Sequence, residues 1–117
     1  MSEITNQFRE SRIEIVKFIA SESEQREFAK NVAYKNYAEE FFEWWFEEWD
    51  PKEQMFKQAF NSQELELLVG FSETWESLDP QFCHNMTINE LLSNSAWVEV
   101  ITKAKAVLVD LNKITKS

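Results

Sequence analysis

The sequence is poor in the residues that make turns and cross-links. Its 117 residues include one glycine, two prolines, one cysteine and one histidine. Sheets and long loops draw on glycine and proline for their turns, so this scarcity favours helices joined by short connections. The single cysteine, Cys83, excludes an internal disulfide and fits a reducing compartment.

The same scarcity limits the chemistry that the chain can perform. A phosphate-binding loop needs several glycines, and a zinc site needs about four nitrogen or sulfur ligands where the chain offers only Cys83 and His84. Adjacency does not make these two a nucleophilic pair, because such side chains must face each other. The Glu-x-x-His pairs of carboxylate metal sites are missing. We predict no enzyme activity and no catalytic, metal or cofactor site, and leave the role of Cys83 and His84 open.

Long apolar runs are also missing, so we expect no membrane-spanning segment. The chain starts Met1-Ser2-Glu3, without a basic segment before an apolar run, and we therefore expect no secretory signal and a cytoplasmic protein. What the sequence does contain is 44% hydrophobic residues, among them ten phenylalanines and five tryptophans. That content is enough for one core, and we predict a single helical domain over residues 1–117.

Negative charge is concentrated in the middle third of the chain. The net charge is −9, and residues 39–80 carry twelve acidic and two basic side chains, a local net charge of −10. Residues 1–38 are neutral overall and residues 81–117 carry +1. Such a surface disfavours nucleic acid and anionic membranes as partners and favours a basic protein. The plainer interpretation is that the charge only keeps the protein in solution.

Apolar residues recur at helical spacing through most of the chain, and polar start signals separate the segments. Residues 3–20 form the first predicted helix, and residues 22–49 the second, with Lys35-Asn36 as a candidate break. Further helices are predicted near residues 55–60, over 62–78, from 88 and from about 95 to 112. Start signals precede them at Ser21-Glu22-Ser23-Glu24, Asp50-Pro51-Lys52-Glu53, Asn61-Ser62-Gln63-Glu64 and Thr87-Ile88-Asn89-Glu90, and Ser93, Asn94 or Ser95 caps the last. The predicted fold is a compact all-α bundle of five to seven helices.

Residues 39–50 consist of six acidic and six aromatic residues and nothing else. On a helix, Trp45, Phe41 and Phe42 fall on one side, and most of the acids fall on the other. The aromatic arc covers about 200°, which is wider than the stripe a core needs. The plain interpretation is a core helix whose acidic side faces solvent. Trp44 lies at the edge of the aromatic arc and is a candidate for contact with a partner.

The predicted helix over residues 62–78 repeats this combination. Glu66, Glu73 and Glu76 lie within about 80° of one another, opposite the apolar stripe, and Leu65 and Val69 fall on the same face. Scattered exposed apolar residues are normal in themselves. The predicted partner-binding residues are the acids of both helices and three apolar anchors: Glu40, Glu43, Trp44, Glu47, Leu65, Glu66, Val69, Glu73 and Glu76.

The pattern over about residues 35–110 resembles a known family. An aromatic and acidic helix is followed by Phe56, Phe60, Glu64-Leu65, Leu68 and Phe71, and then by a final helix that starts near Trp97. Small acidic helical proteins of this pattern resemble the immunity proteins of bacterial contact-dependent growth-inhibition systems. The resemblance implies a protein that binds and blocks a co-encoded toxin, often a nuclease acting on transfer RNA, and transfers no site residues.

Two other classes of function stay open beside this one. An acidic adaptor or nucleic-acid mimic would mask a different basic protein, and an enzyme would use surface carboxylates as acid and base. We expect a cognate basic toxin as the partner, without nucleic acid, membrane or small-molecule substrate.

Overall fold

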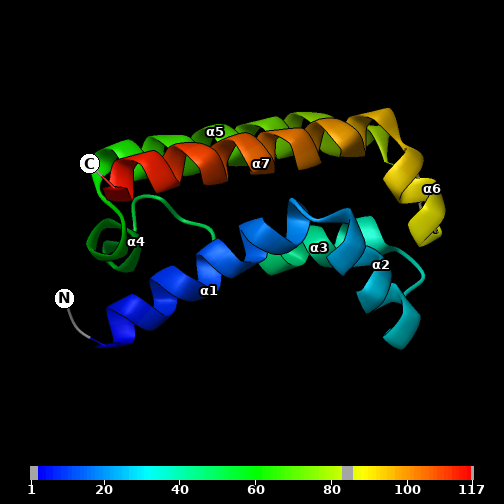
Figure 1. Ribbon diagram of the computed structural model, residues 1–117, viewed down its shortest axis with the longest axis horizontal. Coiled ribbons are helices and arrows are strands. Elements are labelled where there is room, and N and C mark those ends of the chain that lie inside the picture. The colour runs from blue at the N-terminus through cyan, green and yellow to red at the C-terminus, as the bar shows by residue number, and fades with distance from the viewer. Residues whose placement is uncertain (1–2, 83–85, 117) are drawn as a thin grey trace.

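The structure, a computed structural model, describes residues 3–82 and 86–116 (Figure 1). Most of the described residues are helical, and they include no strand. The helices are α1 (Glu3–Ile19), α2 (Glu22–Asn31), α3 (Tyr37–Phe46), α4 (Gln54–Ala59), α5 (Ser62–Leu78), the short 3-10 helix η1 (Asp79–Gln81), α6 (Ile88–Ser93) and α7 (Ser95–Lys116). The predicted all-α bundle of five to seven helices is therefore confirmed.

The helices form two layers. In Figure 1, α5 and α7 run alongside each other in one layer, and α1 and α3 form the other. The short helices α2 and α6 lie together at one end of the bundle, and α4 lies at the opposite end. The result is an elongated body of 40 × 24 × 24 Å.

Aromatic rings fill the space between the layers. Trp45 of α3 lies edge-on to Phe71 of α5, and Trp75 of α5 lies edge-on to Trp97 of α7, at centroid distances of 5.3 and 5.6 Å. Ring pairs of this geometry stabilise a core beyond the apolar area that they bury. The largest fully buried apolar side chains are Trp45, Trp75, Trp97, Phe41, Phe56, Phe71, Ile19, Leu68 and Leu91.

Most of the predicted start signals are confirmed as helix caps. The side chains of Asn61 and Thr87 each accept a hydrogen bond from the backbone N–H three residues later, and Glu64 and Glu90 complete both capping boxes. Ser21 accepts from the backbone of the residue three positions on in the same way. Among the three candidates for the last helix, Asn94 is the residue whose side chain accepts from the first N–H groups, those of Ala96 and Trp97. These caps satisfy donors that a helix leaves unpaired.

The candidate break in the predicted helix over residues 22–49 is confirmed, but the predicted end of that helix is wrong. The chain leaves the helix at residues 32–36, which include Lys35-Asn36, and Asn36 caps α3 by accepting from the N–H of Glu39. Helix α3 then ends at Phe46 rather than near residue 49. Its end is fixed by Arg12 of α1, which donates to the carbonyl oxygens of Trp44 and Trp45 at 3.0 and 2.9 Å. A buried cation there satisfies carbonyl groups of the last turn.

The second incorrect prediction is the start of α4. The start signal Asp50-Pro51-Lys52-Glu53 predicts Asp50 as the cap and Pro51 as the first helical residue. Instead the Asp50 carboxylate accepts from the N–H of Lys52 at 3.0 Å, and the helix begins at Gln54 with Glu53 as a cap that makes no side-chain hydrogen bond. An aspartate that bonds the backbone two residues on makes a tight turn, which delays the helix.

Glu64 combines two structural roles at the start of α5. The residue is 5% exposed. Its carboxylate closes the capping box with the N–H of Asn61 and accepts from both terminal nitrogens of Arg9 at 3.0 and 2.6 Å. Arg9 also donates to the carbonyl oxygen of Ala59 and lies 5.0 Å above the ring of Phe60. Burial acts to raise the pKa of Glu64, but the hydrogen bonds from Arg9 and Asn61 and the charge of Arg9 outweigh it and lower the pKa below 4.5.

This pair predicts a pH-dependent stability. Since the folded-state pKa of Glu64 is lowered, its contribution is fully present above pH 4.5 and is lost as the pH falls through the folded pKa. We expect Glu64→Gln to lower the free energy of unfolding by about 2 kcal/mol at pH 7, and the difference from the parent protein to shrink by pH 3. Urea denaturation at both pH values measures it. Glu66→Gln, exposed on the same helix, is the control, and a Glu64→Gln effect of equal size at both pH values would contradict the assignment.

Gly70 lies in the middle of α5, where a Cβ would meet only the end of the Lys103 side chain of α7, at 3.7 Å. A flexible lysine can move, so this helix crossing does not require a glycine. We expect Gly70→Ala to raise the free energy of unfolding by about 1 kcal/mol, because alanine is the better helix former. Chemical denaturation measures the change, with Ala104→Gly in the facing helix expected to have the opposite sign. A destabilised Gly70→Ala protein would indicate that the two helices cannot accept the methyl group.

Candidate partner-binding surface

The acidic side of α3 forms a regular row. Glu39, Glu43 and Glu47 are exposed and follow one another at four-residue intervals, which places them along one edge of the helix. Beside this row Phe42 and Phe46 are half-buried, and their rings stack with centroids 4.1 Å apart. Both rings also lie edge-on against Trp75 of α5. The row of acids therefore borders an aromatic surface whose rings pack against one another.

Three hollows follow one another along this edge. The first, of about 510 Å³, lies between α3 and η1 and reaches from Glu39 and Phe42 to Asp79 and Phe82. The second, of about 430 Å³, is lined by Phe42, Glu43, Phe46 and Glu47. The third, of about 660 Å³, lies beyond the end of α3 and is lined by Phe8, Glu47, Glu48, Trp49, Asp50, Glu53 and Met55. Because neighbouring hollows share lining residues, we treat them as one groove and call it the α3 groove.

The α3 groove is acidic over its whole length. Seven carboxylates line its three hollows, and none of the described lining residues is basic: the acids are Glu39, Glu43, Glu47, Glu48, Asp50, Glu53 and Asp79. Arg12, buried behind the groove, has one terminal nitrogen 3.8 Å from Glu48, a loose contact with an exposed carboxylate. Burial, together with the negative charge of Glu39, raises the pKa of Asp79. The groove thus holds like charges in proximity, and a cation placed in it would relieve their repulsion.

The predicted partner-binding acids fall into two groups. Glu43 and Glu47 lie in the α3 groove, and Glu40 is half-buried on the same helix. The α5 acids Glu66, Glu73 and Glu76 are exposed, as expected, but do not line any of its three hollows.

The three predicted apolar anchors are less accessible than expected. Trp44 is half-buried and lies 5.0–5.2 Å from the rings of Phe18, Phe28 and Phe41, between α1, α2 and α3. Leu65 was expected outside the core, but it is half-buried and packs against it. Its position on α5 adjoins the buried side of the helix, so the edge of the core covers it. Val69 is also half-buried, and the exposed large apolar residues of the described chain are Ile4, Val98 and Val109.

Sequence reasoning missed the opposite wall of the first hollow. Asp79, Pro80 and Phe82 come from η1 and the residue after it, far along the chain from α3. The four-residue spacing of Glu39, Glu43 and Glu47 was a visible signal of an acidic edge. No local pattern indicated that η1 would face it, because that proximity depends on how α5 packs on α3.

Neither a metal site nor a membrane-spanning helix is found among the described residues. Over residues 3–82 and 86–116, no group of three or more histidine, cysteine, aspartate or glutamate side chains is placed to hold a metal ion. Within the same part of the chain, no helix is long and apolar enough to cross a membrane. Cys83 and His84 lie outside the described residues, and the predicted absence of catalysis and of a cofactor stays a prediction.

Comparison with known proteins adds no relative. Neither the protein-family models nor the curated proteins nor the solved structures gave a match to this chain. The resemblance to immunity proteins therefore stands on the sequence pattern alone.

Proposed function

We propose that this protein is a bacterial immunity protein that binds and neutralises a cognate toxin, a basic nuclease acting on RNA such as transfer RNA. The observation that carries the proposal is the α3 groove, in which seven carboxylates border an aromatic surface and no basic residue is found among those of its lining that the structure describes. In this role the protein acts stoichiometrically in the cytoplasm, without catalysis, and without nucleic acid, membrane or a small-molecule substrate.

The chemistry of a nuclease supplies the matching surface. An enzyme that binds a polyanion presents lysine and arginine side chains, and these groups would enter an acidic groove. Arginine suits this groove in particular, because its planar cation binds carboxylates through two hydrogen bonds and stacks on aromatic rings. Glu43 and Phe42, which line adjoining hollows, offer both contacts side by side.

The acidic adaptor or nucleic-acid mimic is the second candidate. The row of Glu39, Glu43 and Glu47 favours the mimic. Carboxylates four residues apart on a helix repeat about every 6 Å along its axis, so this row presents regularly spaced negative charges. A mimic would use this row to occupy the site where another basic protein binds nucleic acid. The two candidates differ in their partner rather than in their surface.

Purification of the tagged protein from its native host separates the candidates. An immunity protein should retain one basic protein in equal amount, encoded by the neighbouring gene and toxic when expressed alone. Co-expression should abolish that toxicity and inhibit RNA cleavage by the purified partner. A mimic should instead retain a nucleic-acid-binding protein that free DNA or RNA displaces. Recovery of no partner, or of one that is acidic, would contradict both.

A further inference from the structure

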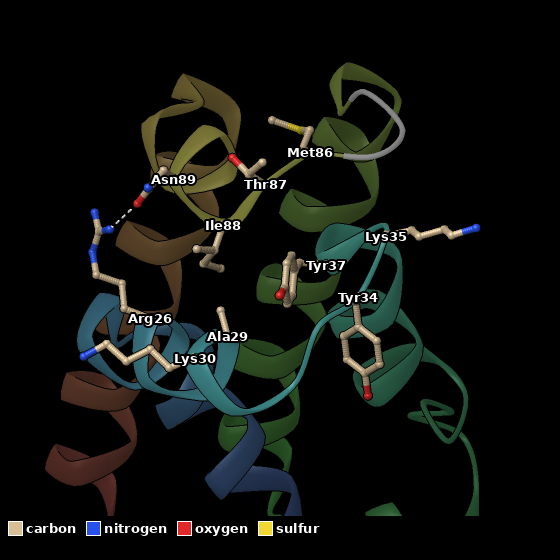
Figure 2. A pocket seen from close by; sticks show the side chains of 10 residues that line it. All are labelled: Arg26, Ala29, Lys30, Tyr34, Lys35, Tyr37, Met86, Thr87, Ile88 and Asn89. Atoms are coloured by element: carbon tan, nitrogen blue, oxygen red, sulfur yellow. Dashed lines mark hydrogen bonds between the residues drawn. The ribbon is translucent and has the colours of Figure 1, made fainter.

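Another hollow, of about 800 Å³, lies beside the connection between α2 and α3 (Figure 2). Its walls come from α2, the connection itself, the first residue of α3 and the start of α6. This volume is in the range of small-molecule sites, about 300–1,000 Å³. We call it the α2–α6 pocket.

The floor of the α2–α6 pocket is apolar and aromatic. Figure 2 shows Ile88, Ala29 and Tyr37 converging on its centre. Tyr37 is buried, and its hydroxyl donates to the carbonyl oxygen of Val32 at 2.9 Å, so its ring is held in place. Tyr34 lies edge-on to it at 5.7 Å and extends the aromatic wall. Such a wall suits the face of a planar or apolar group.

The rim of the α2–α6 pocket carries positive charge. Arg26, Lys30 and Lys35 line it, and the described lining residues include no aspartate or glutamate. Arg26 donates to the side-chain oxygen of Asn89 at 2.6 Å, which holds its guanidinium at the opening, while the two lysines extend on opposite sides (Figure 2). Lys30 also lies 3.5 Å from Glu27, but both side chains are exposed, and such a pair is weak. In a chain of net charge −9, this is a local reversal of sign.

We propose that the α2–α6 pocket binds a small organic anion with a planar or apolar body. The body packs against Tyr37 and Ile88, and a phosphate or carboxylate lies at the rim, where Arg26 and Lys30 supply charged donors. This site goes beyond the proposed function and is independent of it, because the two hollow regions have no described lining residue in common.

Two matched pairs of probes test the binding and identify the anionic group. Adenosine 5′-monophosphate is compared with adenosine, and indole-3-acetate with indole-3-acetamide, by titration of the full chain observed through its backbone amide NMR signals. We expect at least one anion to shift the amides of Tyr34, Tyr37 and Ile88 at concentrations where its neutral analogue does not. A response to the monophosphate alone assigns a phosphate, and a response to indole-3-acetate alone assigns a carboxylate. No response to either anion overturns the proposal.

Variants of the lining residues test whether the anion binds in the α2–α6 pocket. Lys30→Gln with Lys35→Gln should weaken it about fivefold, whereas Lys52→Gln with Lys57→Gln, the same charge change at exposed lysines near α4, should leave it unchanged. Ala29→Leu should reduce it by filling the floor, and Ala33→Leu, exposed in the connection, is the matched control. Circular dichroism verifies that each variant keeps its helices. Equal weakening by both lysine pairs, or equal binding of anion and neutral analogue, would overturn the proposal as well.

Discussion

Replacing Trp45 with alanine is expected to lower the free energy of unfolding by about 4 kcal/mol. The side chain is fully buried, and its indole N–H donates to the hydroxyl of Ser72 at 2.8 Å. The guanidinium of Arg12 lies 5.0 Å above its ring, and Trp49 stacks on it with centroids 5.3 Å apart. Alanine would leave a cavity between α1, α3 and α5 and remove contacts to all three neighbours.

Urea denaturation followed by circular dichroism measures this loss, which is a large part of the roughly 5–15 kcal/mol typical of a domain. Trp44→Ala, next to it in the chain but half-buried, is the matched control and should cost clearly less. Trp45→Phe should recover part of the stability, because it restores apolar volume without the hydrogen bond to Ser72. If Trp45→Ala and Trp44→Ala unfolded at the same urea concentration, the packing described around Trp45 would be wrong.

The buried aromatic face of α3 could be predicted because it depends on local periodicity alone. Phe41 and Trp45 fall on one side of any helix drawn through residues 37–46, and both are fully buried. The polar groups that hold this face in place could not be predicted in the same way. Arg12 lies four residues after Phe8 and four before Val16, on the apolar side of α1, and is 3% exposed. The position of Arg12 on the apolar side of α1 could be predicted from the sequence. Its hydrogen-bond acceptors could not, because they are backbone carbonyl groups of α3 and no sequence pattern identifies them.

Gln25 illustrates the same limit. It is fully buried at the junction of three helices, where it donates to the carbonyl oxygen of Ile19 and accepts from the indole N–H of Trp97. One side chain thus caps the end of α1 and satisfies the donor of a core tryptophan of α7. A glutamine in a polar helix such as α2 normally points to solvent, so its role follows only from the packing of α2 on α7.

The same distinction between local periodicity and tertiary packing applies to the candidate site. Glu43 and Glu47 were predicted from the side of the helix on which they fall, but Glu39, which also lines the groove, was not among the predicted binding residues. The grouping of these acids with Asp79 and Phe82 depends on the direction in which α5 delivers η1, a property of the tertiary packing. Net charge by segment indicated where the acidic surface lies, but not that it is hollowed or that Phe42 and Phe46 border it. The α2–α6 pocket had no sequence signal, because its basic rim belongs to a segment whose total charge is zero.

Reversing the charge of the α3 row should have the largest effect on partner binding. We expect Glu39→Lys, Glu43→Lys and Glu47→Lys together to slow association with the proposed basic partner about 100-fold at low salt. All three side chains are exposed, so the unfolding midpoint should change little. The effect should diminish as salt is added, because exposed charges are screened over about 8 Å at physiological ionic strength. Stopped-flow association at several salt concentrations measures it.

The matched control carries the same change of charge on α5. Glu66→Lys, Glu73→Lys and Glu76→Lys are also exposed, but they line none of the three hollows of the α3 groove. If the partner enters the groove, its cations lose direct carboxylate contacts only in the α3 variant, which should therefore also dissociate faster. The α5 variant should slow association through the long-range field and leave dissociation unchanged. Equal effects of the two triple variants on both rates would show that net charge alone attracts the partner, and unchanged rates for the α3 variant would exclude the groove as its binding site.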